Sequence, residues 1–366
     1  MRVTIAYFLG AHEDWGGASR ALLNFVRQID RTRFRPIVLV TKRGPLVERL
    51  QSEGIEWLAW PTHDRGPNLV RYAADVWRAA RFFRAHALQV LHINHGLIGW
   101  KPAEVLAARV LRIPIINHLH VAFEQPSSFI RYSASVVAVS QYVADHSESL
   151  GAPKCVIHNI SDLQRFANGV SLRRELGYTD SDVIVAFLGQ LIRVKGLEMF
   201  IDVATRVVDP HARFIVAGAL RNTQGAYTED EVKELVGRDP RIRYLGFRTD
   251  VENLYATSDV VVMPSQWDEP CAMVLFEAAA AGKPVVATAT GGTAEILRDG
   301  ETGYLVERHD LEGMTARVAR LVQDRELRNR LGEAASQLAR RSLAVEPVRQ
   351  LEGLYASLIN VQSFST

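Results

Sequence analysis

Residues 259–295 read DVVVMPSQWDEPCAMVLFEAAAAGKPVVATATGGTAE, and the rest of the chain can be interpreted outward from them. Asp259 to Pro264 is a short apolar run that ends in a proline, which is typical of a buried strand. Ala272 to Ala281 is rich in alanine and predicts a helix, which Gly282 ends. Val285 to Ala287 is the next expected strand. The stretch therefore predicts a strand–helix–strand unit of an α/β fold.

Two carboxylates accompany this predicted helix. Glu269 stands at its mouth, and Glu277 lies inside it. The N–H groups at a helix start lack backbone partners and bind anions, and ligands of parallel sheets bind at the carboxyl ends of the strands. The loop and the helix start thus form a candidate anion site. Its candidate ligand-binding residues are the helix-opening residues Pro270, Cys271, Ala272, Met273 and Val274.

This arrangement resembles the glutamate-x7-glutamate signature of the family 4 retaining glycosyltransferases, which use nucleotide sugars and have the GT-B fold of two Rossmann-like domains. The match comprises Asp259, Pro264-Ser265, Glu269-Pro270, Glu277-Ala278, Gly282 to Val286, Gly291-Gly292, Glu295 and Gly303. The resemblance implies that Glu269 binds hydroxyls of the donor sugar and that Glu277 binds the ribose diol of the nucleotide. Taken alone, each glutamate is equally consistent with a structural role, Glu269 at a helix N-terminus and Glu277 as a solvated helix residue.

The size and composition of the chain are those of an ordinary soluble protein. Its 366 residues predict two domains at about 150 residues each. Hydrophobic residues make up 48% and charged residues 23%, and no apolar run approaches the length that spans a bilayer. The apolar start, Val3 to Leu9, is expected as a first strand rather than a signal peptide, because no small-residue cleavage site follows it. Cys155 and Cys271 are too few for a disulfide framework or a metal site, so a cytoplasmic location is expected.

The net charge of +2 conceals an asymmetry along the chain. Through Ile160 there are 19 Lys and Arg against 12 Asp and Glu, whereas the remainder holds 24 against 29. A basic first half is consistent with an anionic acceptor or with peripheral contact with an anionic membrane, and no nucleic-acid partner is expected. Uneven but solvated surface charge is the alternative.

The first half alternates short β-branched runs with helical stretches, which predicts a doubly wound parallel sheet. The same alternation resumes after a stretch without apolar periodicity, so two such α/β domains are expected to face a central cleft. The resemblance adds that the last helix crosses back to the first domain. The expected parts are an acceptor-side domain (1–160), a linker (161–182), a donor domain (183–345) and a crossover helix with its tail (346–366).

The loop after the first expected strand ends in Gly16-Gly17, directly before a helix. Paired glycines let the backbone approach a phosphate or sugar closely, although such a pair is often only a turn. The family has its glycine-rich acceptor-side loop here, so the resemblance implies that Gly16 and Gly17 bind ligand. The chain has no G-x-G-x-x-G, the fingerprint of dinucleotide binding.

Histidines gather at the ends of two expected strands, with His92 and His95 at the end of one and His118 and His120 at the end of the next. No cysteine and no H-E-x-x-H accompanies them, so zinc ligation is not expected. The resemblance implies that His120 lies beside the donor sugar and the reaction centre, with His118 as the nearer alternative. A hydrogen-bonded core histidine is the other interpretation of each.

The expected helix from Leu69 to Arg84 combines four arginines with Trp77, Phe82 and Phe83. Such a helix can lie on an anionic membrane surface. The interpretation we favour is that its aromatic residues face the core while the arginines extend outward into water.

The expected second sheet begins at Val183, and the segment from Gly189 to Gly196 follows its first strand. The family places an arginine and a lysine on the donor diphosphate from this loop. Lys195 is retained, and the arginine position holds Gln190, so Arg193 is the candidate second cation. The resemblance also places the nucleobase near Phe247.

No metal or other cofactor is expected. Asp180-Ser181-Asp182 has the D-x-D form of metal-dependent glycosyltransferases, but it lies between the expected domains and is interpreted as a solvated turn. The resemblance implies same-face attack, with Lys195 supporting the leaving diphosphate and with His120 and Glu269 orienting the sugar. The expected acceptor is a glycan, a lipid-linked molecule or a small molecule. The alternatives are a sugar-nucleotide-binding or scaffolding protein and a retaining phosphorylase.

Overall fold

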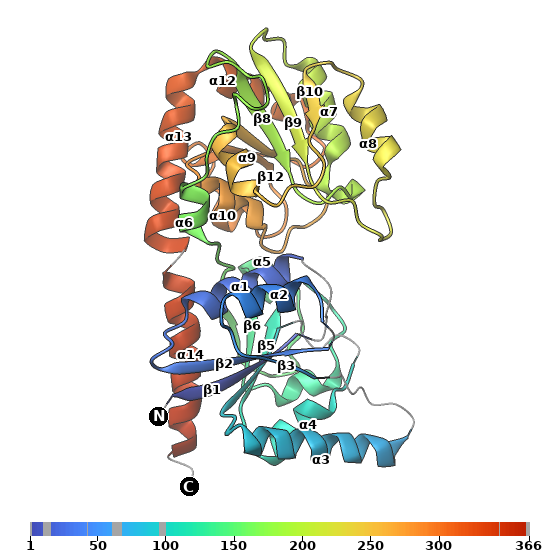
Figure 1. Ribbon diagram of the computed structural model, residues 1–366, viewed down its shortest axis with the longest axis vertical. Coiled ribbons are helices and arrows are strands. Elements are labelled where there is room, and N and C mark those ends of the chain that lie inside the picture. Colours follow the sequence, from blue (N-terminus) through green and yellow to red (C-terminus); the bar gives the residue numbers. More distant parts are fainter. Residues whose placement is uncertain are drawn as a thin grey trace. The chain divides into compact units, whose positions relative to one another are not determined.

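The computed structural model describes residues 2–9, 16–41, 43–60, 68–94, 100–343 and 345–363. The chain forms two compact units (Figure 1), the first from residues 1–160 with 346–366 and the second from residues 161–345. Each unit contains one parallel β-sheet with its helices. The predicted pair of Rossmann-like parallel-sheet domains is thus confirmed.

The first unit has seven parallel strands in the order β3-β2-β1-β4-β5-β6-β7. The strands are β1 (Val3–Phe8), β2 (Phe34–Val40), β3 (Trp57–Ala59), β4 (Val90–Ile93), β5 (Ile115–Leu119), β6 (Ser135–Ala138) and β7 (Lys154–Val156). Successive residues of β1 point to opposite faces, so Ile5 and Tyr7 enter one core and Ala6 and Phe8 the other. A strand buried on both faces reads as a continuous apolar run, which is why β1 was recognisable in the sequence.

Helices cover both faces of this sheet. They are α1 (Gly17–Gln28), α2 (Pro45–Ser52), α3 (Leu69–Ala85), α4 (Ala103–Val110), α5 (Gln141–Asp145) and α14 (Glu346–Ser363), with a 3₁₀ turn at Ser128–Tyr132. Apolar residues of α1, α2 and α14 share one core, and those of α3 and α4 share the other. The last helix, α14, inserts Leu351 and Tyr355 into the first unit, as the predicted crossover requires.

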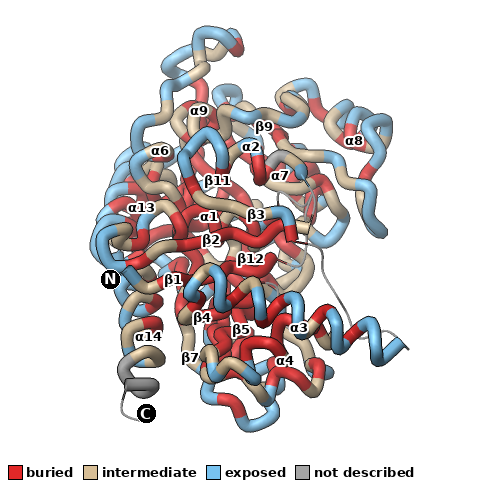
Figure 2. The backbone as a smooth tube through the Cα atoms, turned by 60° about the horizontal axis from the view of Figure 1, so that its bottom comes forward, coloured by how far each residue is buried: buried red, intermediate tan, exposed pale blue. Residues whose placement is uncertain are grey.

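The helix α3 departs in one residue from the favoured interpretation. Phe83 is fully buried and Phe82 packs on Trp60 with ring centroids 4.5 Å apart, as expected of core aromatics. Trp77, however, is 64% exposed. The outer side of α3 is correspondingly pale blue in Figure 2. The core interpretation is therefore wrong for Trp77, because its position falls on the outward side of the helix together with the arginines.

The helix α5 ends at Asp145, and the chain does not continue as a helix to Gly151. Leu150 and Gly151 both have positive φ angles, 49° and 88°, which a right-handed helix cannot contain.

The second unit has six parallel strands in the order β10-β9-β8-β11-β12-β13. They are β8 (Val183–Leu188), β9 (Ala212–Ala217), β10 (Ile242–Tyr244), β11 (Val260–Met263), β12 (Val285–Thr288) and β13 (Gly303–Val306). The helices are α6 (Leu163–Ala167), α7 (Leu197–Arg206), α8 (Glu229–Val236), α9 (Val251–Thr257), α10 (Met273–Ala280), α11 (Thr293–Ile296), α12 (Leu311–Gln323) and α13 (Arg325–Leu338). One core combines the strands with α7, α8, α12 and α13, and α6, α9 and α10 pack against one another.

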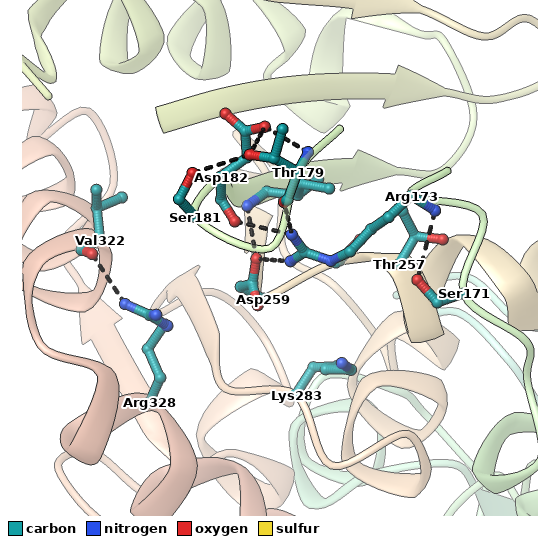
Figure 3. Close-up of polar contacts among 12 residues, drawn as sticks. Ser171, Arg173, Thr179, Ser181, Asp182, Thr257, Asp259, Lys283, Val322 and Arg328 are labelled. Atoms are coloured by element: carbon teal, nitrogen blue, oxygen red, sulfur yellow. Dashed lines mark hydrogen bonds and ion pairs between the residues drawn. The ribbon is translucent and has the colours of Figure 1, made fainter. Parts of the chain in front are cut away.

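The segment 161–182, which was expected to be a linker, belongs to the second unit. Arg173 donates to the carbonyl oxygens of Thr179 and Asp182, at 3.1 and 2.8 Å, and forms an ion pair with Asp259 (Figure 3). Asp259 also accepts the N–H of Ile184 at 2.7 Å, at the start of β8. Arg173 and Asp259 thus attach this segment to the sheet.

The D-x-D segment is a turn whose last carboxylate is not solvated. Asp182 is only 7% exposed and accepts hydrogen bonds from the Thr179 N–H and hydroxyl at 2.7 and 2.8 Å. Because these donors come from the turn itself, the Asp182 carboxylate stabilises the local backbone. The expectation of a solvated turn is wrong for this residue.

Across the described ranges, no helix combines the length and the apolar character needed to cross a membrane.

Candidate functional site

In the second unit the strand order reverses between β8 and β11, and ligands of such sheets bind at the carboxyl ends of the strands at this point. The segment from Gly189 to Gly196 follows β8, and the segment from Pro264 to Ala272 follows β11. The two segments are joined directly, since the Gln266 N–H donates to the Val194 carbonyl at 2.7 Å. We call this carboxyl-end region of the second unit the β8/β11 site.

Lys195 and Glu269 meet at this site. The Lys195 ammonium lies 2.6 Å from Oε1 of Glu269, and the Ser265 hydroxyl donates to the same oxygen. Glu269 is 3% exposed, so its carboxylate is held by a cation and a hydroxyl away from bulk water. The ammonium also lies 4.9 Å from the ring centroid of Trp267, a cation–π distance. One lysine is thereby fixed between a carboxylate and an aromatic face.

Two glycines allow the segments to approach this closely. Gly196 has φ +78°, and a Cβ there would lie 1.9 Å from the Pro264 carbonyl oxygen. Gly291 has φ +52°, and its Cβ would lie 2.3 Å from the Glu269 carbonyl oxygen. Neither distance is compatible with a side chain, so both positions require glycine. Gly196 and Gly291 therefore permit the close backbone packing around Lys195 and Glu269.

Glu277 lies within α10, one turn beyond the site's helix start. It is 2% exposed, and its Oε2 accepts the Tyr255 hydroxyl at 2.9 Å. Glu277 is therefore not a solvated helix residue. The helix that carries it opens at Met273, and its N-cap, Ala272, offers no side-chain cap. The N–H groups of this helix start, which includes Val274, are consequently placed as anion donors.

The two residues before this N-cap continue the expected ligand-binding segment. Pro270 is buried and lies directly after Glu269. Cys271 is buried, 7% exposed, and is not in a disulfide.

Buried polar atoms without a protein partner lie in the segments that follow β11 and β12. Within the part of the chain that the structure describes, Gln266 Oε1, Trp267 Nε1, Thr290 Oγ1 and Thr293 Oγ1 are such atoms. Buried polar groups are nearly always hydrogen-bonded, so a group of exceptions indicates a bound ligand or water. Sequence reasoning did not identify Trp267, Thr290 or Thr293, because nothing in their spacing distinguishes them from ordinary loop residues.

The candidate second cation, Arg193, lies among carboxylates. It pairs with Glu198 at 3.1 Å and Glu231 at 2.6 Å, and its guanidinium lies 4.7 Å from the Tyr227 ring centroid. Its side chain is 50% exposed. The structure therefore places the Arg193 guanidinium against α7 and α8, not against the Lys195–Glu269 pair.

Gln190 and Phe247 both follow strands at the carboxyl edge of this sheet. With its amide oxygen turned toward Arg221, Gln190 accepts two hydrogen bonds from that guanidinium, from Nε at 3.2 Å and from Nη2 at 2.7 Å. Phe247 follows β10 and is 65% exposed. An exposed aromatic ring at this edge offers a flat apolar surface to a planar ligand.

In the first unit the strand order reverses between β1 and β4. Gly16 precedes α1, and a Cβ added to Gly17 would meet nothing within 4 Å, so the backbone there is open to a ligand. His120 follows β5, and its Nε2 lies 3.3 Å from Asn94 Oδ1, after β4. His95 lies outside the described residues. The expected residues Gly16, Gly17 and His120 thus all belong to the carboxyl edge of this sheet.

A buried chain of contacts leads from this edge to the last helix. His92 Nε2 lies 3.1 Å from His118 Nδ1, His92 Nδ1 lies 2.7 Å from the Tyr355 hydroxyl, and Tyr355 donates to Tyr7 at 2.9 Å. The His118 and His120 rings stack at 4.5 Å. His118 is 1% exposed and fits the core interpretation, whereas His120 is partly exposed.

Burial determines the protonation state of His92 in this series of contacts. Desolvation, with a smaller contribution from His120, lowers the pKa of His92 to about 3. His92 is therefore neutral near pH 7. Because Tyr355 donates its proton to Tyr7, it accepts from His92, which places the imidazole proton of His92 on Nδ1.

Over the residues with described positions, no group of three or more His, Cys, Asp or Glu side chains is arranged to hold a metal ion.

Comparison with known proteins covers both units. Residues 171–338 match the family model described as glycosyl transferases group 1, and residues 15–165 match the model of glycosyltransferase family 4. The β8/β11 site lies within the first of these matches, and the edge that carries Gly16 and His120 lies within the second.

Two curated relatives and one solved structure illustrate the similarity. A D-inositol 3-phosphate glycosyltransferase of Corynebacterium aurimucosum is 32% identical over 303 residues, covering 79% of this chain and 68% of that protein. The lipopolysaccharide core biosynthesis mannosyltransferase LpsB of Rhizobium meliloti is 31% identical over 279 residues, covering 70% and 77%. The crystal structure of Anabaena HepE in complex with UDP has a TM-score of 0.82 at 22% identity, covering 98% and 100%. At that identity, the HepE likeness establishes the fold.

Proposed function

Because the chain belongs to the family 4 glycosyltransferases, we propose that it transfers a glycosyl unit from a UDP- or GDP-sugar to an acceptor hydroxyl with retention of configuration. The observation that carries this proposal is the Lys195–Glu269 pair beside the uncapped start of α10. A lysine and helix N–H groups bind a diphosphate, and a neighbouring carboxylate binds sugar hydroxyls.

The donor then occupies the β8/β11 site in a defined direction. Its diphosphate lies against Lys195 and the start of α10, its sugar against Glu269, and its ribose diol against Glu277. Phe247 is the candidate surface for the base, since it is exposed at the same edge. The fold shared with HepE, which was crystallised with UDP, supports a nucleotide donor.

The reaction we propose needs no covalent intermediate and no metal. The bond from the sugar C1 to the diphosphate oxygen breaks as the acceptor oxygen attacks C1 from the same face. The acceptor's proton passes to the departing diphosphate. Lys195 and the α10 N–H groups stabilise the negative charge that grows on the leaving oxygen. His120 and Glu269 orient the sugar.

The acceptor is assigned to the first unit, at Gly16, Gly17 and the edge that carries His120. The relatives are named for a phosphorylated inositol and for lipopolysaccharide core synthesis, which supports an anionic or lipid-linked acceptor in glycan or glycolipid assembly. The surplus of basic residues through Ile160 suits such a molecule.

The exposed face of α3 supports a peripheral membrane location. Val70 is 82% and Trp77 64% exposed, and the Arg81 guanidinium lies 5.7 Å from the Trp77 ring centroid. Arg71 and Arg84 are also exposed on this helix. An apolar and aromatic strip edged by arginines binds anionic lipid surfaces. We place the enzyme on the cytoplasmic side, since neither Cys155 nor Cys271 is in a disulfide.

A donor panel tests the proposed function. The protein is screened by thermal shift with UDP, GDP and their sugars, and the donor that stabilises it is then assayed for nucleoside diphosphate release with and without acceptors. NMR of the product assigns the anomer. Binding without turnover would favour a scaffolding protein, phosphate-dependent turnover a phosphorylase, and an inverted anomer would contradict retention.

A further inference from the structure

The second sheet contains an arginine that none of the motifs singles out. Arg221 follows β9, and its guanidinium donates from Nε and Nη2 to the Gln190 side chain, at 3.2 and 2.7 Å. Two donors to one oxygen fix the plane and the position of the guanidinium. The side chain that fixes it stands where the family resemblance expects an arginine.

The backbone brings these two residues together. Beyond the ends of β8 and β9 the chains stay paired, with a parallel bridge between Leu191 and Leu220 and the Leu191 N–H donating to the Ala219 carbonyl at 3.0 Å. Gly218 makes this approach possible, because a Cβ there would lie 1.7 Å from the Gly189 carbonyl oxygen. Arg221 therefore projects from a rigid extension of the sheet next to Gln190.

The charges of the site leave a role for this guanidinium. A diphosphate carries at least two negative charges, and Gln190 brings none to balance them. Arg193 is paired with Glu198 and Glu231, whose carboxylates offset its charge. Lys195 belongs to the loop after β8, and Arg221 belongs to the neighbouring loop after β9.

We infer that Arg221, positioned by Gln190, is the guanidinium that binds the donor diphosphate together with Lys195. The inference rests on the proposed function. The guanidinium of Arg221 then lies beside residue 190, where the family has an arginine, but it comes from the loop after β9. The positive charge is thus retained, although a different residue bears it.

The test compares nucleoside diphosphate binding by calorimetry, with UDP and GDP as probes. Arg221→Ala is expected to weaken the affinity about 10- to 100-fold, the usual effect of removing a charge-assisted hydrogen bond. Arg221→Lys keeps the positive charge but loses the forked guanidinium, so its affinity is expected to lie between those of the unaltered protein and Arg221→Ala. The affinity for uridine or guanosine, which have no phosphate, stays unchanged. Arg206→Ala, at an exposed arginine in the last turn of α7, is the matched control.

A second variant separates ligand binding from a structural role. In the Arg221→Ala background, Gln190→Arg restores the guanidinium at the same place and is expected to recover the diphosphate affinity. A merely structural Arg221 would not be rescued in this way. Circular dichroism and thermal unfolding confirm that each variant is folded.

The outcomes are distinguishable. If the unaltered protein binds neither UDP nor GDP, the proposed function itself fails. If it binds and Arg221→Ala binds equally well, the inference fails alone. The inference is also overturned if Arg193→Ala, and not Arg221→Ala, removes the diphosphate affinity, or if Gln190→Arg restores nothing.

Discussion

The Lys195 ammonium lies 2.6 Å from the Glu269 carboxylate at the carboxyl edge of the second sheet, with only 4% of the Glu269 side chain exposed. In this pair each charge compensates the burial of the other. A diphosphate that binds here attracts the ammonium, while sugar hydroxyls become donors to the carboxylate. On the proposed function, the pair keeps both groups in place for a donor whose diphosphate binds Lys195 and whose sugar binds Glu269.

Glu277 is expected to contribute mainly to nucleotide affinity. Glu277→Gln keeps the shape of the side chain but removes the charge that accepts the ribose hydroxyls, and the loss of a charged hydrogen bond costs about 1.5–3 kcal/mol. Calorimetry with UDP and GDP should show affinity about 10- to 100-fold lower. Glu234→Gln, at an exposed position on α8, is the control. Equal affinity in the Glu277 variant would remove the ribose assignment.

The Arg173–Asp259 pair is expected to stabilise the second unit. Arg173→Ala leaves the Asp259 carboxylate without its cation and frees two carbonyl oxygens of the segment 161–182. The free energy of unfolding should fall by about 2 kcal/mol in urea titrations. Lys233→Ala breaks an exposed pair with Glu229, which water screens, and should cost far less. Similar losses in the two variants would contradict the structural role.

Acid should destabilise the first unit through His92. Its pKa is lowered to about 3 by burial and by His120, among neighbours that include Tyr7, Tyr355 and His118. Since the unfolded chain binds this proton below its ordinary pKa of 6.5, the stability it contributes is complete above pH 6.5 and is lost as the pH falls toward 3.

The loss amounts to at most about 1.4 kcal/mol per pH unit. Urea unfolding between pH 7 and 5 measures it. His92→Gln should flatten this dependence relative to the unaltered protein, whereas the control His211→Gln, at an exposed position, should not. If the free energy of unfolding fell equally with pH in all three proteins, His92 would not be the group responsible.

Membrane contact through α3 predicts salt-dependent binding to vesicles. Co-sedimentation with anionic vesicles should be strong at low salt and weak at high salt, because the arginines act through screened charge. Trp77→Ala and Arg81→Glu should each reduce it. Val208→Asp, at a residue of the second unit that is 90% exposed, serves as the control. If the unaltered protein fails to bind at low salt, the membrane proposal is wrong.

Local pattern was sufficient to predict the α/β class, because strands buried on both faces, such as β1 and β11, read as continuous apolar runs between helical stretches. The family resemblance singled out Lys195, Glu269 and Glu277 as candidate site residues, and their roles stay predictions. Pattern was insufficient where contacts are distant in sequence. Tyr355 reaches His92 from the other end of the chain, and Arg221 reaches Gln190 from another loop.

Side-chain direction was the second limit. The composition of α3 does not indicate whether Trp77 faces the core or the solvent. Only the packing of the helix against the first sheet determines its direction. Ion pairing was the third limit on prediction from the sequence. The carboxylates that pair with Arg193 lie on two different helices, α7 and α8. Glu198 and Glu231 could not be placed beside that arginine before the fold was known.

The central claim is that Lys195 stabilises charge on a departing nucleoside diphosphate. The most direct measurement is the rate of nucleoside diphosphate release from the donor that binds, by the unaltered protein and by Lys195→Ala, each with a chelator present. The account predicts release that persists in the chelator and falls about 10²- to 10³-fold in the variant, with a much smaller change in donor affinity. Equal rates for the two proteins, or release that the chelator abolishes, would contradict it.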